Sequence, residues 1–372
     1  MIRGISMQQN GAKLPPLKIG RHTARKAIVQ GGMGVGISMS GLAAAVAEEG
    51  GIGVISTVAI GILSGEKNFR KINRTALAKE IRKAKEKTDG VLGCNIMVAI
   101  SDYDKILECA IEEGIDMLFL GAGLPLHFPK SLPPKKLREI NTAFVPIVSS
   151  AKAAELIFRY WTNKFDTVPD AVVVEGPLAG GHLGFKRDQI DNPQYALEVI
   201  VPAVVSVVRT YERQAGRGIP VIAAGGVYSG GDIRKYLQLG AGGVQMGTRF
   251  VATHECDAGM AFKRSYIDAQ KEDIAIIQSP VGLPGRAIEN RFLKQVAAGE
   301  RKPFKCFWKC LKTCDYRQAP YCIASALKNA KDGDLENGFA FAGANAYRVN
   351  EIVSVKELMD SLESEFAKAV PE

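Results

Sequence analysis

Residues 172–184 read VVVEGPLAGGHLG, and this stretch indicates how the rest of the chain is organised. Its apolar β-branched run is typical of a strand that is buried on both faces of a parallel sheet. The run ends abruptly at Glu175, and glycines then surround His182, one of four histidines in the chain. A titratable ring on a glycine-rich loop after a buried strand is where catalysis is expected in an α/β barrel. The residues therefore favour a catalytic role for His182, and the alternative is a tight loop with a surface histidine.

Short apolar strands followed by glycine or polar residues recur along the chain, with helical segments between them. This alternation predicts right-handed βαβ units and a parallel sheet. Eight such units in about 250 residues predict an α/β fold, the (β/α)8 or TIM barrel, with a doubly wound open sheet as the alternative. The expected strands are residues 27–30, 53–57, 91–98, 117–120, 144–148, 171–174, 219–224 and 243–246. The expected helices are residues 40–50, which Ser40 would cap, 73–88, 103–113, 152–160, 195–209 and 230–239.

The pattern changes after residue 284, where the alternation of strands and helices stops. Residues 1–284 are expected to form the barrel together with a polar N-terminal arm, residues 1–26. Residues 285–372 are expected to form a helical C-terminal appendage that carries four cysteines and acts as a lid over the substrate. A second glycine- and alanine-rich loop, residues 338–345, is expected to return over the site.

The composition of the 372 residues, 47% hydrophobic and 23% charged, is typical of a soluble globular protein. The net charge of +9 favours acidic ligands such as phosphates or an acidic carrier protein. No basic block is interleaved with aromatic residues, so nucleic acid is not an expected partner. The N-terminus lacks the apolar core of a signal peptide, and no apolar run reaches membrane-spanning length. We therefore expect a cytoplasmic protein without a membrane partner.

Two consecutive predicted strands, within residues 219–250, each end in glycine. Gly225 and Gly226 follow the first, and Gly247 and Thr248 follow the second. Exposed backbone N–H groups in such turns form an anion-binding nest, and nearby helix N-termini add partial positive charge. In a (β/α)8 barrel, the loops after strands seven and eight commonly bind a phosphate group. The sequence therefore predicts a phosphorylated ligand at these turns.

Five segments resemble the nitronate monooxygenase family, also called 2-nitropropane dioxygenases. That family shares its flavin-binding barrel with the flavin-dependent enoyl-acyl-carrier-protein reductases. The segments are QGGMGVGIS, CNIMV, VEGPLAGGHLG, IPVIAAGGVYSGGDI and GGVQMGTRF, and they cover most of residues 27–250 in the family's order. The resemblance implies a flavin-binding barrel with FMN as its cofactor.

Carried over residue by residue, the resemblance implies that His182 is the catalytic residue. It places Gly32 and Met33 beside the flavin ring, and Asn95 in a hydrogen bond to the ring system. Glu175 stands where many monooxygenases have glutamine, a departure that leans toward the reductases. The remaining implied contacts, at the ribityl and phosphate end of FMN, are Gly180, Gly226, Gln245, Met246, Gly247 and Thr248, beside Gly225 of the turn described above.

Three functions are compatible with this resemblance. A nitronate monooxygenase would oxidise alkyl nitronates and nitroalkanes with O2, and His182 would remove the α-proton of a neutral nitroalkane as general base. An enoyl-thioester reductase would use NAD(P)H and the same site residues, with an acyl carrier as its partner. A flavin or iron–sulfur redox partner or sensor is the third alternative. In the first two the substrate is a small molecule, and a homodimer is expected.

Four cysteines, Cys306, Cys310, Cys314 and Cys322, lie close together in the C-terminal appendage. On a helix, the spacing of the first three would bring them near one face, and Cys322 would close the set after a turn that contains Pro320. Four thiolates can bind a [4Fe–4S] cluster or a structural zinc ion. The sequence therefore predicts a metal site here, with free thiols as the alternative.

Overall fold

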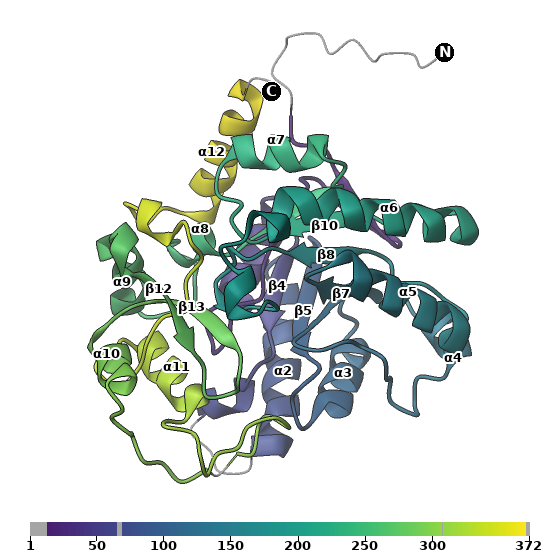
Figure 1. The fold of residues 1–372 in the computed structure, drawn as a ribbon. Coiled ribbons are helices and arrows are strands. Elements are labelled where there is room, and N and C mark those ends of the chain that lie inside the picture. The colour runs from purple at the N-terminus through teal and green to yellow at the C-terminus, as the bar shows by residue number, and fades with distance from the viewer. Residues whose placement is uncertain (1–12, 65–68, 307, 370–372) are drawn as a thin grey trace.

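The computed structural model describes residues 13–64, 69–306 and 308–369. Eight parallel strands form one sheet in the order β3-β11-β10-β8-β7-β6-β5-β4. A parallel bridge between Val29 and Ile52 joins the two edges of this sheet, so it closes into a barrel (Figure 1). The strands are β3 (Ile28–Gln30), β4 (Gly53–Ser56), β5 (Leu92–Met97), β6 (Met117–Gly121), β7 (Ala143–Val148), β8 (Val172–Glu175), β10 (Val221–Ala224) and β11 (Gly243–Met246). The predicted (β/α)8 barrel is confirmed, with each strand where the sequence predicted it.

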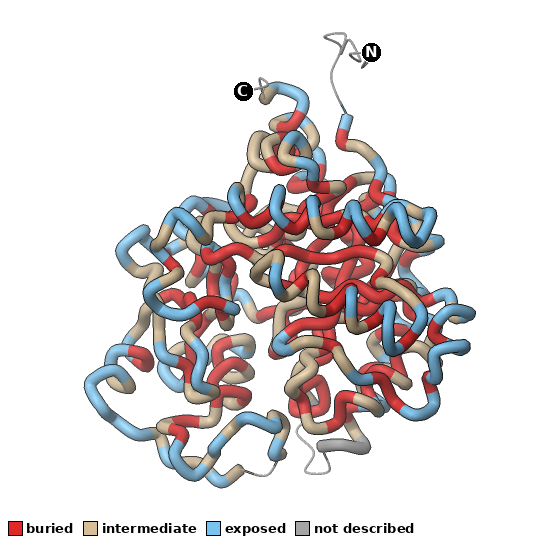
Figure 2. The backbone as a smooth tube through the Cα atoms, turned by 45° about the vertical axis from the view of Figure 1, so that its right-hand side comes forward, coloured by how far each residue is buried: buried red, intermediate tan, exposed pale blue. Residues whose placement is uncertain are grey.

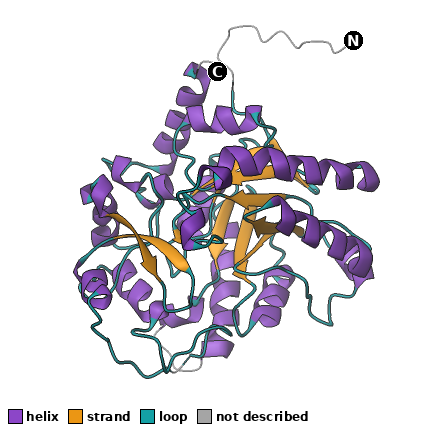
Figure 3. Ribbon diagram, in the orientation of Figure 1, coloured by secondary structure: helices purple, strands orange, loops and turns teal. Residues whose placement is uncertain are grey.

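Helices on the outside of the barrel connect these strands, and Figure 3 shows them around the central sheet. They are α1 (Ser40–Glu48), α2 (Phe69–Lys85), α3 (Tyr103–Glu112), α4 (Pro134–Glu139), α5 (Ala151–Phe165), α6 (Leu197–Ala215) and α7 (Gly230–Gln238). The prediction that Ser40 caps α1 is wrong, because Met39 is the N-cap residue and no side chain of α1 closes the cap. Asp257 instead accepts hydrogen bonds from the backbone N–H groups of Met39, Gly41 and Leu42.

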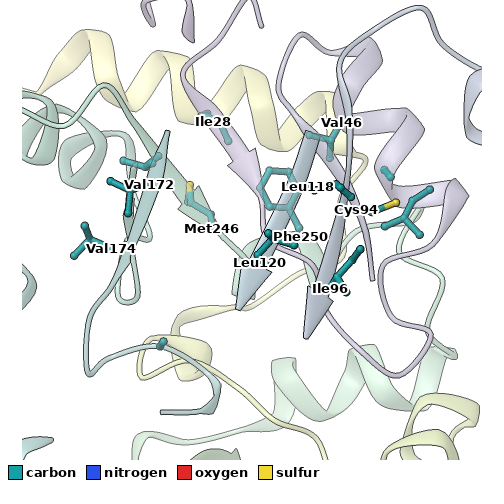
Figure 4. Packing of buried hydrophobic residues seen from close by; sticks show 14 of the residues in the cluster. Ile28, Val46, Cys94, Ile96, Leu118, Leu120, Val172, Val174, Met246 and Phe250 are labelled. Carbon is teal, nitrogen blue, oxygen red and sulfur yellow. The ribbon is translucent and has the colours of Figure 1, made fainter. Parts of the chain in front are cut away.

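The core has two layers because successive strand residues point to opposite faces of the sheet. Val173 belongs to a buried cluster inside the barrel, which also contains Val29 and Phe119. Its neighbours Val172 and Val174 belong to the larger cluster between the sheet and the helices (Figure 4). This double burial explains why the strands are continuous apolar runs rather than alternating ones. Figure 2 shows the buried backbone concentrated in the barrel and on the inward faces of its helices.

The described part of the N-terminal arm is a hairpin, β1 (Leu17–Ile19) with β2 (His22–Ala24). Leu17 and Ile19 are buried and belong to the cluster inside the barrel. The expectation of a merely polar arm is therefore corrected for residues 13–26: their alternating apolar side chains pack into the barrel. Residues 1–12 lie outside the described residues.

The chain after β11 packs beside the barrel rather than extending it (Figure 1). Its helices and strands are α8 (Thr248–Val251), α9 (Met260–Asp268), β12 (Ile274–Gln278), β13 (Pro284–Ile288), α10 (Arg291–Ala297), α11 (Ile323–Asp332) and α12 (Val355–Lys368). The loops of the described residues also contain β9 (Gly181–His182) and the 3₁₀ turns η1 (Ile60–Ser64), η2 (Arg187–Gln189), η3 (Pro193–Tyr195), η4 (Lys271–Asp273) and η5 (Ala346–Arg348). β12 and β13 pair across the expected boundary at residue 284, and β13 also pairs with β9. α12 returns to the barrel, where Glu365 accepts a hydrogen bond from the N–H of Gly230 at the start of α7. None of the helices in the described ranges is both long and apolar enough to cross a membrane.

Candidate active site

A cavity of about 330 Å³ lies at the carboxyl ends of the barrel strands, within the size range of ligand pockets. Polar residues occupy the last inward-facing position of several strands there. Inward-facing positions are those that share the face of Val173, because alternate residues of a strand point to the same side. Glu175 follows Val173 by two residues, and Asn95, Gln245 and Ser56 occupy the same layer on their own strands. The structure brings all of the predicted catalytic and flavin-contacting residues to this cavity: Gly32, Met33, Asn95, Glu175, Gly180, His182, Gly225, Gly226, Gln245, Met246, Gly247 and Thr248.

His182 is held from two sides. Its Nε2 lies 2.7 Å from the hydroxyl oxygen of Ser279, which follows β12. The ring of Phe341 lies 5.0 Å away, edge to face. Burial lowers the pKa of His182 to about 4, because the charged imidazolium loses its hydration. The ring is therefore neutral near pH 7. In the tautomer in which Nε2–H donates to Ser279, the lone pair of Nδ1 is available to accept a proton.

Glu175 ends β8 inside the mouth of the barrel. Its carboxyl group has no hydrogen bond or ion pair with the described residues. Burial raises the pKa of Glu175 to about 7, since no cation offsets the loss of water around the charged form. The site thus contains two titratable groups with altered pKa values, a frequent property of catalytic sites.

The turn after β10 depends on glycine backbone angles, whereas Gly247 after β11 has a φ of −124°. Gly225 and Gly226 have φ angles of +88° and +99°, a region that residues with a side chain rarely adopt. The side chain of Asn345 donates a hydrogen bond of 2.7 Å to the carbonyl of Gly226 and so fixes this turn. Asn345 belongs to the second glycine-rich loop, which was predicted to return over the site and does line the cavity.

The N-terminus of α7 is closed to a ligand, contrary to the expectation that nearby helix N-termini contribute. Asp232 accepts hydrogen bonds from the N–H groups of Tyr228 and Ser229. The N–H of Gly230 is bound by Glu365 from α12. A phosphate at this end of the cavity would therefore depend on the glycine turns themselves.

The cavity fits a flavin phosphate held by backbone groups rather than by side-chain cations. No Lys or Arg lines it within the described ranges, although the chain carries a net charge of +9. Close backbone approach shapes its walls: a Cβ on Gly180 would lie 2.5 Å from the carbonyl carbon of Ala342. A Cβ on Gly343 would lie 2.8 Å from the hydroxyl oxygen of Thr248. Glycine-lined walls with free polar groups such as Ser56 Oγ, which is buried without a partner, suit a cofactor with a polar ring and a phosphate.

Arg286 supports the loop between β8 and His182 from behind. Its side chain is buried, with 5% exposed. One guanidinium nitrogen donates hydrogen bonds of 2.5 Å to the carbonyl of Pro177 and 2.9 Å to that of Ala179. Arg286 also pairs with Gly181 in the β9–β13 ladder. Phe341 belongs to residues 338–345, which were predicted to return over the site. Sequence reasoning missed Arg286 and Ser279, because nothing in their local sequence shows that they return to residues 177–182.

The predicted metal site is not supported. The described residues between α10 and α11 are not helical, and Lys309 has a φ angle of +44°, so the first three cysteines do not share a helix face. Of the four cysteines, Cys310 lines the cavity, and its pKa is raised to about 12 by burial and then by the neighbouring thiols. The described residues contain no group of three or more His, Cys, Asp or Glu side chains that is placed to hold a metal ion.

The closed barrel, the glycine turns after β10 and β11 and the buried histidine define an α/β barrel with a candidate active site at the carboxyl ends of its strands. Its class, a flavin-dependent oxidoreductase, follows from the comparisons with known proteins. The chain belongs to the nitronate monooxygenase family, whose sequence model matches residues 16–365. This result confirms the resemblance and shows an enzyme.

Relatives within this group have different names. The (3aS,4S,5R,7aS)-5-hydroxy-7a-methyl-1-oxo-octahydro-1H-indene-4-carboxyl-CoA dehydrogenase of Mycobacterium tuberculosis is 29% identical over 74% of this chain. A probable nitronate monooxygenase of Staphylococcus aureus is 35% identical over 35% of this chain. The matches span 66% and 35% of these relatives' own lengths. The structure of FabK from Thermotoga maritima covers 94% of both chains at 30% identity, with a TM-score of 0.70.

Proposed function

We propose that the protein is an FMN-dependent nitronate monooxygenase that oxidises alkyl nitronates and nitroalkanes with O2. The observation that carries this proposal is the position of His182, which lines the cavity and is held by Ser279 at 2.7 Å. Burial, which lowers its pKa to about 4, leaves the ring neutral near pH 7. A general base must be unprotonated and within reach of the substrate. His182 is unprotonated near pH 7, and it lines the cavity in which the substrate would bind.

The residues of the cavity divide between the two ends of FMN. Gly32, Met33 and Asn95 would contact the ring system, and the turns at Gly226 and Gly247 would bind the phosphate. Bound FMN would supply the redox chemistry, accepting electrons from the nitronate and passing them to O2.

The chain's own contribution is to orient the substrate and to move its proton. Ser279 and Phe341 hold the ring of His182, so that its free nitrogen keeps one direction. In a neutral nitroalkane, that nitrogen takes the proton from the α-carbon, and the electron pair of the broken C–H bond passes to the nitro group to give the nitronate. Burial of the site keeps water from competing as a proton acceptor.

The decisive experiment compares substrates that need the base with substrates that do not. In FMN-loaded protein, His182→Ala should reduce kcat/KM for 2-nitropropane by ~10²–10⁴-fold, measured as O2 consumption. The same variant should lose less than ~10-fold on the pre-ionised nitronate, because no α-proton has to be removed. Equal losses on both substrates would contradict a role of His182 as base.

His127→Ala is the matched control for this experiment. His127 is an exposed histidine, whose Nε2 lies 3.2 Å from Asp104, and it does not line the cavity. Both substrates should be oxidised at the unmodified rate in this variant.

A second candidate function, the reduction of enoyl thioesters with NAD(P)H, is favoured by Glu175. A neutral His182 does not readily donate its one remaining ring proton. Glu175, with a pKa of about 7, is a suitable proton donor. The Mycobacterium tuberculosis relative, which is named as a carboxyl-CoA dehydrogenase, adds support. NAD(P)H oxidation that depends on crotonyl-CoA and disappears in Glu175→Gln would favour this function, with or without an acyl carrier as the natural partner.

We further infer that residues 285–372 form the lid of the site, since Cys310, Leu311, Ile323 and Asn345 all line the cavity. The cytoplasmic location and the homodimer stay predictions.

A further inference from the structure

The two ends of the cavity lie on opposite sides of the barrel mouth, and they are lined by different kinds of residues. In the closed strand order, β10 lies across from β5. The glycine turns occupy the end near β10 and β11. The end near β4 and β5, here called the alkyl end, is lined by Val58, Ile100, Leu311, Ile323 and Leu327.

The C-terminal part of the chain builds much of the alkyl end. Leu311 forms an antiparallel bridge with Ile100, the loop residue after β5. Ile323 and Leu327 lie one turn apart on α11, so both face the same wall. Val58 packs against the buried cluster to which Ile323 and Leu327 belong. These contacts give the alkyl end an apolar wall drawn from three separate segments.

One polar pair interrupts this wall. Asn73 and Asp102 both line the cavity and are buried, with 2% and 6% of their surfaces exposed. Asn73 Nδ2 donates a hydrogen bond of 2.7 Å to Asp102 Oδ2, and Asn73 Oδ1 accepts one of 2.7 Å from the N–H of Gly61. No ion pair of the described residues includes Asp102, and no Lys or Arg lines the cavity in those ranges. Asp102 is therefore an acidic side chain that a ligand meets at this end, and Asn73 holds it in place.

We propose that the alkyl end binds the uncharged hydrocarbon part of the substrate and that Asp102 is a specificity residue that excludes substrates with a carboxylate there. The proposal rests on the proposed function for the chemistry at the nitro group, and it adds the class of substrate. A substrate carboxylate in this buried space would lose its water, and no Lys or Arg of the described residues lines the cavity to offset that loss. It would also lie close to the acidic side chain of Asp102. Neutral nitroalkanes with longer chains gain contact with the apolar wall instead.

The catalytic test uses the full FMN-loaded chain and substrates that differ in one property. From nitroethane to 1-nitrobutane, kcat/KM should rise by up to ~4-fold for each methylene group. 3-Nitropropionamide and 3-nitropropionate have nearly the same shape and differ in charge, and the amide should be used at least ~30-fold better. Equal use of the two, or a preference for the carboxylate, would overturn the proposal while leaving nitronate oxidation intact.

Asp102→Asn tests the residue itself, since it removes the charge and keeps the size and an acceptor for Asn73. The ratio of kcat/KM for the carboxylate to that for the amide should rise by ~10-fold in this variant. Asp104→Asn is the control, because Asp104 lies two residues further on α3 but is half exposed and pairs with His127 outside the cavity. The same rise in both variants would show a general charge effect and contradict the assignment.

A binding measurement keeps the inference testable if no nitro compound is oxidised. Titration of hexanamide and hexanoate into the FMN-loaded protein, followed by the flavin absorbance, requires no turnover. Hexanamide should bind at least ~10-fold more tightly than hexanoate. Equal affinities would overturn the inference. If no nitro compound is oxidised but hexanamide binds more tightly than hexanoate as expected, only the proposed function is rejected.

Discussion

The Nε2 of His182 lies 2.7 Å from the hydroxyl oxygen of Ser279, although 97 residues separate them along the chain. The hydrogen bond joins β9 to the turn between β12 and β13. It fixes the orientation of the ring whichever nitrogen carries the proton. A feature outside the eight barrel repeats thus sets the direction of the proposed base.

Removal of this hydrogen bond should impair proton transfer more than substrate binding. We expect Ser279→Ala to lower kcat for neutral nitroalkanes by ~10-fold, with KM changed less, because the ring loses its preferred orientation. Steady-state O2 consumption at several substrate concentrations separates the two parameters. Ser265→Ala is the control, since the Ser265 hydroxyl donates a hydrogen bond to the carbonyl of Phe262 on its own helix. A change confined to KM would argue for a contact with substrate instead.

The pH dependence of activity should follow the neutral form of His182. Because its pKa is lowered to about 4, the base is available throughout the neutral range and is lost as pH falls through about 4. In FMN-loaded protein that is still folded at pH 4, the rate with 2-nitropropane should drop tenfold per pH unit below that value. The rate with pre-formed nitronate should not follow this curve. A midpoint near 6.5 for the neutral substrate would show that the histidine is more hydrated than its position indicates.

Glu175 should make the flavin-free protein less stable as pH rises. Its pKa is about 7 when folded and near 4.5 when unfolded, so the folded state binds more protons between these values. The free energy of unfolding therefore falls as pH rises from about 4.5 to about 7, by roughly 3 kcal/mol in all. Glu175→Gln should match the unmodified protein more closely at pH 4.5 and exceed it at pH 8 in urea unfolding. A difference in the free energy of unfolding that does not change with pH would contradict this prediction. Glu86→Gln, at an exposed position, is the control, and its free energy of unfolding should equal that of the unmodified protein at both pH values.

Arg286 should act through the loop that it supports. Arg286→Ala leaves the carbonyls of Pro177 and Ala179 without their donor, a loss that we expect to cost about 3 kcal/mol of stability and to weaken FMN binding. FMN fluorescence quenching and thermal unfolding measure the two effects. Added guanidinium chloride at low concentration should restore part of the FMN affinity, because the small cation can occupy the vacated space. Arg213→Ala, an exposed change on α6, should alter neither quantity, and a lack of rescue in a folded variant would count against positioning.

Close backbone packing should make Gly180 irreplaceable. An added Cβ would lie 2.5 Å from the carbonyl carbon of Ala342, so the loop carrying residues 342–343 would have to move away from the cavity. We expect Gly180→Ala to lower the melting temperature by several degrees and to reduce FMN affinity at least ~10-fold. The control is Gly218→Ala, where the nearest atom would lie 3.9 Å from the new Cβ. Equal behaviour of the two variants would contradict the packing argument.

Much of the barrel was predictable from local pattern. Each strand is a short apolar run that ends in glycine or a polar residue, and helices follow at regular intervals, so positions such as Val172–Glu175 were identified without tertiary information. The clustered cysteines show the limit of that approach. Their spacing predicts a helix, but the chain at Cys310 is not helical, and its carbonyl accepts a hydrogen bond from the N–H of Ser101 in the loop after β5.

The sequence by itself determined the (β/α)8 barrel and the strand-end residues that line the cavity, including His182, Glu175 and Gly226. Strand periodicity and the closed topology carry those residues to one mouth, so local order was sufficient. Only the tertiary structure decided what surrounds them. Ser279 reaches His182, Arg286 reaches the loop at Pro177, and Asn73 reaches Asp102. Segments distant in sequence pack together there, and nothing in local spacing encodes those contacts.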